Sequence, residues 1–423
     1  MNPPKKLIAG LPQFDRRIWI LIAGRLLSQM GSGFVLFYAP IFFVNQVGLS
    51  AAAVGIGIGS ESISGVFGRI LGGSLADSPQ WGRRKTLLLS AAISAMADLV
   101  LAFSYNFPTF LLGNLLMGLG IGLYWPATEA VVADLASLEH RNEAFALNRL
   151  ADSLGLSLGV VLGGALIATT GSYRALFVID GISFLVLLAI VYKAIAETLN
   201  PYQVGKPGWQ GWVTALRDRP LLVYISANVL FTTYLAFVSS TLPLYLTNFV
   251  SERAQQPGFT PVVISALFTW HVALAALCQL PAARWLNRFS RPKALMLSAG
   301  LWAIGFGLVW VTGTAAADHL AWAGLTLAVM ALATVSYTPA ASSLVVGLAP
   351  NSARGVYLSL NSLCWAVGYF VGPVMGGWAM DQSRSIATGF WVAVALSVIG
   401  AIGILLWLDR LLDKAKMERS RVS

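Results

Sequence analysis

The sequence predicts an all-α membrane protein, with twelve transmembrane helices arranged as two six-helix repeats. Three observations carry this prediction. Hydrophobic residues make up 57% of the 423 residues, charged residues make up only 11%, and the mean hydropathy is +0.72. Apolar stretches long enough to cross a bilayer, which takes about 20 residues per helix, recur along the whole chain. The two halves of the chain also resemble each other at one fixed offset.

The low charge content excludes a soluble domain, because such domains carry about 25% charged residues. The apolar runs are continuous, whereas the strands of a membrane β-barrel are about 10 residues long and alternate in polarity. Since lipid offers no water to the backbone, helices are the remaining structure. The predicted spans are 18–45, 51–76, 86–105, 109–133, 144–169, 174–196, 220–249, 262–284, 294–313, 321–347, 356–380 and 388–408.

The formal net charge of +10 reflects membrane topology and does not indicate a nucleic-acid partner. Basic residues gather in alternate loops, which is the pattern of cytoplasmic loops under the positive-inside rule. The opposite loops hold only Arg174, Arg253 and Arg384. An even number of spans places both termini on the basic side, so we expect both to be cytoplasmic in a bacterial inner membrane. The basic positions are Lys5, Lys6, Arg16, Arg17, Arg83, Arg84, Lys85, Arg284, Arg288, Arg291, Lys293, Lys414, Lys416, Arg419 and Arg421.

Enzyme and cofactor signals are missing from the sequence. Cys278 and Cys364 lie inside apolar runs, which argues against a disulfide framework or a metal cluster. The chain has no HExxH pair, no suitably spaced Ser–Lys or Ser–His pair and no phosphate-binding glycine loop. We therefore expect no cofactor and no metal. A membrane-embedded enzyme or a non-transporting receptor is the alternative from another class, and it is disfavoured.

A polar segment over 197–219 divides the chain into an N-terminal half, 1–196, and a C-terminal half, 220–423, with a basic tail. Its Pro and Gly residues are typical of a cytoplasmic linker. Within it, Trp209–Arg217 is predicted to form a short amphipathic helix whose Trp residues lie among the lipid headgroups.

The two halves repeat at a single offset, the one that places Arg141 on Arg354 and superimposes YWPATEAVVADLA on YTPAASSLVVGLA. Small-residue bias of membrane helices explains some glycine matches but not the matched Pro and Arg. Two similar halves in the same orientation can rock about a central site and expose it alternately, so the repeat predicts a secondary transporter with its substrate path between the halves. The matched pairs are Pro126/Pro339, Arg141/Arg354, Asn148/Asn361, Gly155/Gly368, Gly159/Gly372, Gly163/Gly376 and Gly164/Gly377.

The loop between spans two and three, GGSLADSPQWGRRK, resembles the signature loop of the major facilitator superfamily. The matching residues are Gly73, Asp77, Gly82, Arg83 and Arg84. The resemblance implies that Gly73 allows close helix packing and that Asp77 lies by the positive N-terminal end of a helix from the other half. It also implies that the arginines pair with an acid such as Asp134. Together these contacts would hold the cytoplasmic side shut.

Within that superfamily the chain is most similar to the twelve-span bacterial drug:proton antiporters. The similarity lies in stretches such as ALRDRPLLVY and LPAARWLNRF, and GYFVGPVMGG resembles a glycine-rich antiporter motif. The resemblance to these antiporters implies multidrug efflux by antiport. We expect a monomer whose partners are a small-molecule substrate, protons, with sodium ions as the alternative, and the lipid bilayer.

Four charged residues near the cytoplasmic edge are predicted to form a nearly neutral buried network: Arg25, Glu129, Arg149 and Asp152. At about 1.5 Å per residue, all four lie about 7–12 Å from that edge. Arg149 and Asp152 are three residues apart and can pair on one helix face. The network could serve packing or gating without contacting a ligand.

Glu61 is the first candidate for proton coupling, because it lies near the middle of span two with no cation predicted at its depth. Burial without a partner favours the protonated form of a carboxyl group. Asp180 and Asp152 follow as candidates, and His271 is the titratable candidate of the second half. Glu61 and His271 could instead be hydrogen-bonded helix contacts. Asp98 is interpreted as structural.

Aromatic residues in the spans expected to line the cavity suit an apolar or cationic substrate. The sequence therefore predicts a proton-coupled transporter that exports small amphipathic or drug-like molecules by alternating access. A carrier of one metabolite, such as a sugar, a siderophore or an amino acid, is the alternative. The candidate cavity residues are Tyr38, Tyr124, Trp125, Tyr234, Tyr337 and Trp365.

Overall fold

The computed structural model describes residues 15–135, 141–199, 209–250, 258–286, 288–350 and 354–422. Within these ranges every regular element is helical, and twelve helices are long and apolar enough to cross a membrane. The predicted all-α fold with twelve spans is confirmed. Each observed span overlaps its predicted range, and the second span coincides with it at Ala51–Ala76.

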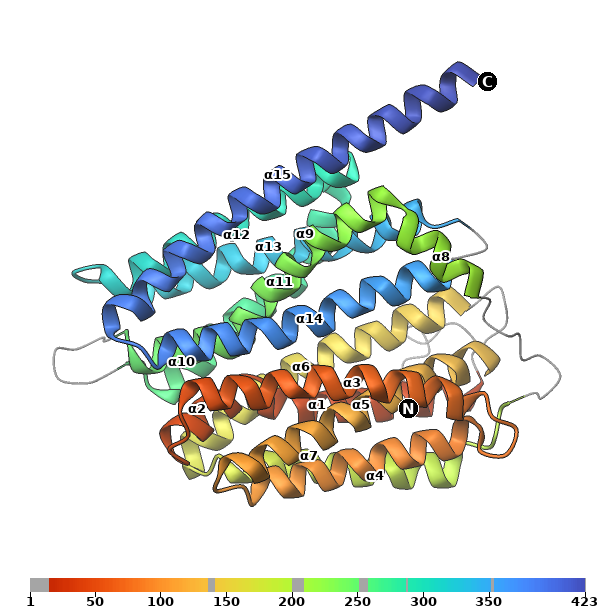
Figure 1. Cartoon of the computed structure of the whole chain (residues 1–423). Helices are drawn as coiled ribbons and strands as arrows, with labels where there is room; N and C mark the ends of the chain where they lie inside the picture. Colours follow the sequence, from red (N-terminus) through yellow and green to blue (C-terminus); the bar gives the residue numbers. More distant parts are fainter. Residues whose placement is uncertain are drawn as a thin grey trace, which may run out of the picture.

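The first six spans form one group of helices, drawn in red to yellow-green in Figure 1. The first span is split, because α1 ends at Leu36 and α2 begins at Ala39. Asp15 caps the start of this span by accepting a hydrogen bond from the Arg17 N–H, and Ser50 caps α3 in the same way. The helices are α1 (Arg16–Leu36), α2 (Ala39–Asn45), α3 (Ala51–Ala76), α4 (Gly82–Ala102), α5 (Phe107–Leu135), α6 (Arg141–Thr170) and α7 (Arg174–Ala194).

The last six spans form the second group, drawn in green to blue. The short α8 (Trp209–Arg217) precedes it and occupies the range predicted for a helix in the linker. The helix α15 continues well beyond the predicted end of its span at 408 and projects from the bundle (Figure 1). The helices are α9 (Arg219–Ala236), the π-helical turn η2 (Phe237–Thr241), α10 (Leu242–Asn248), α11 (Pro261–Leu286), α12 (Arg291–Thr314), α13 (His319–Leu348), α14 (Arg354–Met380) and α15 (Arg384–Val422).

Equivalent helices begin at equivalent positions in the two groups. α6 and α14 start at Arg141 and Arg354, which form one of the pairs matched in the sequence. The first spans match at a different, shorter offset, because they run over Arg16–Asn45 in one group and Arg219–Asn248 in the other. Both first spans also depart from regular α-helix at the same place, after Leu36 and at η2, and each resumes with a proline in its first turn.

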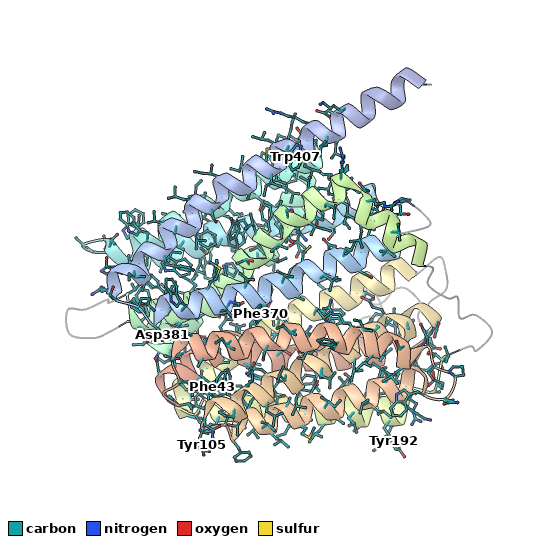
Figure 2. All side chains as sticks on the ribbon, viewed as in Figure 1. Phe43, Tyr105, Tyr192, Phe370, Asp381 and Trp407 are labelled. Carbon is teal, nitrogen blue, oxygen red and sulfur yellow. The ribbon has the colours of Figure 1, made fainter. Side chains whose placement is uncertain are left out.

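Glycine contacts set the closest packing inside the first group. A Cβ atom at Gly68 of α3 would lie 2.9 Å from the Cα of Gly122 in α5. Similarly, a Cβ at Gly33 of α1 would lie 2.9 Å from the Cα of Gly159 in α6. Such backbone contact replaces the hydrophobic effect as the source of helix association in lipid. Large apolar side chains face outward instead, for example Leu277, which is 74% exposed, and Trp407 of α15 (Figure 2).

Candidate functional site

The two groups of helices meet at the end of the molecule opposite α8. We call this end the far end. The opposite end, which carries α8 and the loop between α3 and α4 (the Gly82 loop), is called the linker end. At the far end the amides of Asn45 and Asn248 bond reciprocally across the two groups, with N–O distances of 2.8 and 3.0 Å. Asp381, labelled in Figure 2, accepts hydrogen bonds of 2.7 Å from the N–H groups of both Ala51 and Ala52 at the start of α3.

Further contacts between the two groups extend from the far end toward the middle of the bundle. We call all the contacts between the groups in this region the far-end seam. A Cβ at Gly59 of α3 would lie 3.0 Å from the ring of Phe370 in α14, and Gly55 lies against the backbone of Pro373. The rings of Phe37 and Phe268 stack with centroids 4.3 Å apart. All these residues lie in the parts of their helices nearer the far end, so the described residues close that end.

The signature-like loop at the linker end is held within the first group. Arg83 forms an ion pair with Asp134, the partner that the resemblance implies, and lies 3.9 Å from Asp77. Arg84 instead donates a hydrogen bond of 2.7 Å to the Tyr192 carbonyl. The expected neighbour of Asp77, a helix end from the other group, is not among its described contacts. Asp77 is exposed.

Gly73 makes none of the close contact expected of it, since a Cβ there would meet no atom within 4 Å. The preceding residue, Gly72, has that role, because its Cβ would lie 2.8 Å from the Cα of Leu123. Gly82 is required for a different reason. Its φ of +81° lies in the left-handed region that favours glycine, and a Cβ there would overlap the Glu197 carboxylate.

Glu197 anchors this loop, although sequence analysis did not single it out, since it is one acid just after span six. Its carboxylate accepts hydrogen bonds from the backbone N–H groups of Arg83 and Arg84, at 3.0 and 3.1 Å. Partial burial acts to raise the pKa of Glu197, but hydrogen bonds from the N–H groups of Leu199, Arg83, Arg84 and Thr198 outweigh it, so this pKa lies below its ordinary value.

Arg25 forms a buried ion pair in the part of the first group nearer the linker end. It is only 4% exposed, and its Nε donates a hydrogen bond to Asp152. Its guanidinium also stacks over Trp125 and Tyr124, with its central carbon 4.1 and 4.8 Å from the ring centroids. Asp152 therefore pairs with Arg25, whereas the sequence suggested Arg149, whose side chain lies outside the described residues. Glu129 is exposed on α5 and takes no part in this ion pair.

The second group has a neutral network at the equivalent place. Asn228 occupies the position of Arg25 when the two first spans are aligned, and it accepts a hydrogen bond of 2.6 Å from Tyr337, the equivalent of Tyr124. Asn361 accepts hydrogen bonds from Asn228, at 3.0 Å, and from Tyr224, at 2.7 Å. Both networks thus join the first and fifth spans of their half, but Asn361 is equivalent to Asn148 and not to Asp152, and only the first network is charged.

Three acids of the first group come close together, and we call them the carboxyl cluster: Glu61 of α3, Asp98 of α4 and Asp180 of α7. Asp98 and Asp180 are 0% and 2% exposed, while Glu61 is partly buried. Asp98 interacts electrostatically with both other acids. The sequence analysis set Asp98 aside as structural. The sequence does indicate that Asp98 and Asp180 lie at a similar depth in the membrane, since they are about 6 and 9 Å from the far ends of α4 and α7.

The other candidates are placed less centrally. The Nδ1 of His271 lies 2.9 Å from the Leu327 carbonyl, so this buried side chain has a hydrogen-bond partner. Tyr234 lies within the core of the second group, 2.8 Å from the Ser397 hydroxyl. Tyr38 is buried and donates to the Val160 carbonyl at 3.0 Å. Trp365 stacks on Tyr369, with ring centroids 5.7 Å apart.

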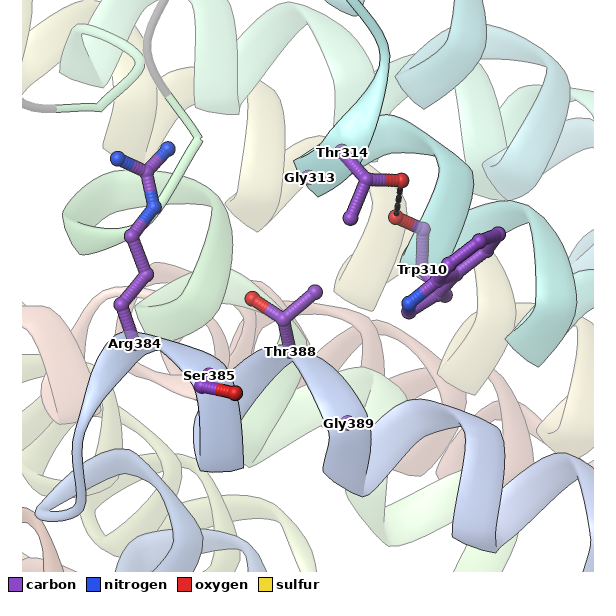
Figure 3. A pocket seen from close by; sticks show the side chains of 7 residues that line it. All are labelled: Trp310, Gly313, Thr314, Arg384, Ser385, Thr388 and Gly389. Atoms are coloured by element: carbon purple, nitrogen blue, oxygen red, sulfur yellow. Dashed lines mark hydrogen bonds between the residues drawn. The ribbon is translucent and has the colours of Figure 1, made fainter.

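A hollow of about 470 Å³ opens between α12 and α15, beside the far end of the second group. Figure 3 shows Arg384 and Trp310 on either side of it, with Thr388 between them. Arg384 donates a hydrogen bond of 3.1 Å to the Phe249 carbonyl. All the lining residues belong to the second group, so this hollow lies apart from the seam between the groups. They are Trp310, Gly313, Thr314, Arg384, Ser385, Thr388 and Gly389.

The family model of the Major Facilitator Superfamily matches residues 21–255 and 245–422, which together cover nearly all of the chain. The chain belongs to the Major Facilitator Superfamily. It is accordingly a secondary transporter and not an enzyme. Solved members share the fold, including a nucleoside transporter NupG mutant (TM-score 0.77, 14% identity, 93% of this chain and 100% of that one). A peptide transporter POT crystallised with alafosfalin gives a TM-score of 0.76 at 15% identity, covering 98% of this chain and 99% of that one.

Curated relatives of this superfamily member extend over almost its whole length. The multidrug resistance protein MdtH of Photorhabdus laumondii is 27% identical over 96% of both chains. MdtH of Cronobacter sakazakii is 26% identical over 92% of this chain and 93% of that one. A Na⁺, Li⁺, K⁺/H⁺ antiporter of Planococcus maritimus is 23% identical over 96% of this chain and 98% of that one.

Proposed function

We propose that this transporter exports small amphipathic or drug-like molecules in exchange for protons. The observation that carries the proposal is the carboxyl cluster, because it places three acids inside the membrane-spanning half that also carries the buried Arg25–Asp152 pair. Ionisable groups inside a bilayer cost several kcal/mol unless paired or hydrated, and they are retained mainly where they serve transport.

The relatives support outward transport and its coupling to protons. Two are named for multidrug resistance and a third for exchange of alkali cations against protons. In each of those activities a proton gradient could drive the other solute outward. The basic loops lie at the linker end, so we place that end in the cytoplasm and both termini with it.

With this orientation, we infer that the far-end seam closes the outer side and that the state described here is inward-facing. The helix α3 carries an acid-binding N-terminus at the outer side, held by Asp381, and Asp77 at its other end. In the outward-facing state we expect the seam to break and Asp77 to approach the N-terminus of α14. The same pair of helices would then be joined at one end in each state.

The surroundings of Arg25 support the proposed substrate class. Its guanidinium lies on the rings of Trp125 and Tyr124 and is paired with Asp152. Rings that already hold a compensated cation suit an apolar or cationic aromatic molecule that takes the place of the guanidinium, because such molecules bind to rings by stacking or by cation–π contact. A polar metabolite stays the alternative, because Arg25 Nη2 and the Tyr124 hydroxyl have no hydrogen-bond partner among the described residues, whereas the equivalent network in the second group is satisfied internally.

Transport in proteoliposomes tests the proposal. Wild type, Glu61→Gln and the control Asp318→Asn are compared with an imposed pH gradient, against a panel of hydrophobic cationic dyes, sugars and amino acids. We expect wild type and Asp318→Asn to move dyes against their gradient at the expense of the pH gradient, and Glu61→Gln to lose this driven movement. If wild type moves dyes at the same rate with and without the gradient, proton coupling is wrong. If only one polar metabolite is carried, with saturation, the metabolite alternative holds.

A further inference from the structure

Asp98 is a fully buried acid that lacks a hydrogen-bond partner. It is 0% exposed, and neither of its carboxyl oxygens accepts or donates a hydrogen bond in the described part of the chain. Buried polar groups are almost always hydrogen-bonded, and a buried charge costs far more than a buried neutral group. A carboxyl group in this position is therefore stable only when it carries a proton.

Asp180 lies beside it and has the opposite character. The Ser183 hydroxyl donates a hydrogen bond of 3.2 Å to Asp180, so Asp180 has the hydrogen-bond partner that Asp98 lacks. The helices α4 and α7 pack closely here, since a Cβ at Gly181, next to Asp180, would lie 3.2 Å from the Cβ of Asp98, and the two acids interact electrostatically. Two carboxyl groups so close in a dry site cannot both be charged.

The helix α1 covers this pair. A Cβ at Gly31 of α1 would overlap the Asp180 carboxylate, so the bare backbone of α1 lies directly on it. Gly31 is in the span that is broken after Leu36, where the regular helix ends and α2 restarts. A movement of α1 relative to α7 would admit water to Asp180 first and to Asp98 behind it.

The charged groups of the neighbouring helices α3 and α1 do not supply a free cation to the pair. From α3, Glu61 faces it and adds a third acid. Arg69 follows Glu61 by about 12 Å along α3, toward the linker end. From α1 the nearest charge is Arg25, which is paired with Asp152.

The charged groups of α7 and α5 lie away from the pair as well. At the start of α7, Arg174 donates to the Ser104 carbonyl at 3.3 Å and to the Ala102 carbonyl. The charged residues of α5, Glu129 and Asp134, lie toward the linker end. The protonation of Asp98 and Asp180 is therefore decided mainly by the two acids and Glu61.

We propose that Asp98 is a proton-binding carboxyl group of this transporter, and that Asp180 is the neighbour through which its proton passes to water. In the closed site Asp98 carries the proton. Water that enters beside Asp180 stabilises the carboxylate form of Asp180, which can then accept the proton of Asp98. When α1 moves away, the proton passes from Asp98 to Asp180 and then to a water molecule, which leaves as hydronium and leaves two carboxylates behind. Rebinding runs the same steps in reverse. This inference rests on the proposed proton coupling and names the group that binds the proton.

Infrared difference spectroscopy of the purified, reconstituted protein tests it without any transport. The C=O stretching band of a protonated carboxyl group is followed as the pH is raised from about 6, where exposed carboxyl groups are already ionised, in wild type, Asp98→Asn, Asp180→Asn and the control Asp318→Asn. Asp318 is an exposed loop residue with a φ of +61°, a conformation that Asn also adopts readily. Substitution by Asn keeps the shape of each side chain, so the variants should fold.

We expect wild type and Asp318→Asn to show a carboxylic band that is absent from Asp98→Asn and altered in frequency in Asp180→Asn. A band that is unchanged in Asp98→Asn overturns the inference. A wild-type band that disappears on adding Na⁺ at constant pH also overturns it, in favour of an alkali-cation site. The readout is independent of transport. If the band behaves as expected but dye transport does not depend on the pH gradient, the proposed function is wrong and the proton site is still supported.

Discussion

Asn45 and Asn248 bond to each other through both amides, although 203 residues separate them in the chain. They end the first span of each half, so the contact joins two equivalent positions across the pseudo-twofold relation between the halves. A reciprocal amide pair is neutral and exchanges readily with water, which makes it suitable for a contact that must open and close. Asp381, nearby, supplies the charged contact of the same seam.

Replacing Asp381 should weaken the closed far end. In Asp381→Ala two N–H groups at the start of α3 lose their acceptor, and loss of such a cap costs about 1 kcal/mol. That shifts the population by roughly fivefold toward states with the far end open. With Cys278 and Cys364 replaced by Ser, labelling of a single cysteine at Phe370, which is half-buried in the seam, by a membrane-impermeant thiol reagent measures the change. Asp409→Ala, on α15 away from the seam, is the control, and equal labelling in both variants would contradict the role of Asp381.

Two glycines that match the signature loop, Gly73 and Gly82, should respond oppositely to alanine. Gly82→Ala forces a side chain into a left-handed conformation and against Glu197, so it should destabilise the protein by about 1–2 kcal/mol. Gly73→Ala meets no atom within 4 Å and lies in a helix, where alanine is favoured. Thermal unfolding in detergent should show a lower Tm for Gly82→Ala and an equal or higher Tm for Gly73→Ala. The reverse order would show that the Gly82 loop is not built as described.

Glu197 should make the stability of this loop depend on pH. Its pKa in the folded protein lies below the ordinary value of 4.5, so its contribution is present above that pH and is lost as the pH falls through the lower folded pKa. The sign is that of a carboxylate stabilised by N–H donors. In Glu197→Gln the Tm should fall less between pH 6 and pH 3, two values chosen to bracket roughly the ordinary Glu range. Parallel pH profiles for the two proteins would contradict this role.

The Arg25–Asp152 pair should behave as a unit. Arg25→Asn leaves Asp152 as an uncompensated charge in a mostly buried position and should cost about 3 kcal/mol, as breaking buried ion pairs does. The double variant Arg25→Asn with Asp152→Asn resembles the neutral network around Asn228 and should recover most of that loss. Chemical denaturation of all four proteins gives the coupling free energy, and additive losses in the double variant would show that the two residues do not interact.

Sequence reasoning reached the architecture because it depends on patterns that lie within one helix. Apolar run lengths located the spans to within a few residues at most boundaries, and the ordered repeat around Pro126 and Pro339 located equivalent helices. Contacts between helices were less accessible. The prediction that Arg25 and Asp152 lie at one depth agrees with their contact. Depth alone does not tell which cation an acid faces, however. The rotation of α6 about its axis turns Asp152 toward Arg25 of α1.

The same limit explains Asp98 and Glu197. Two whole spans, α5 and α6, separate Asp98 from Asp180 along the chain, and only packing of α4 against α7 brings them together. Glu197 lies outside any span, so no burial argument applied, and its role depends on the unusual backbone of Gly82. The match between the two first spans is weak in the sequence because its offset differs from that of the later helices and few side chains match there, although the helix ends and prolines do.

Distances between spin labels test most directly whether the halves close alternately under proton control. With Cys278 and Cys364 replaced by Ser, one labelled pair spans the far end at Gln46 and Ser383, and a second spans the linker end at Gln80 and Arg288. A pair within the first half, Gln80 and Lys193, is the control. Between alkaline and acidic pH we expect the far-end and linker-end distances to change in opposite directions in the otherwise native protein, to stay fixed in Asp98→Asn, and the control distance to stay constant throughout. Distances that change together, or that respond equally in Asp98→Asn, would contradict the account.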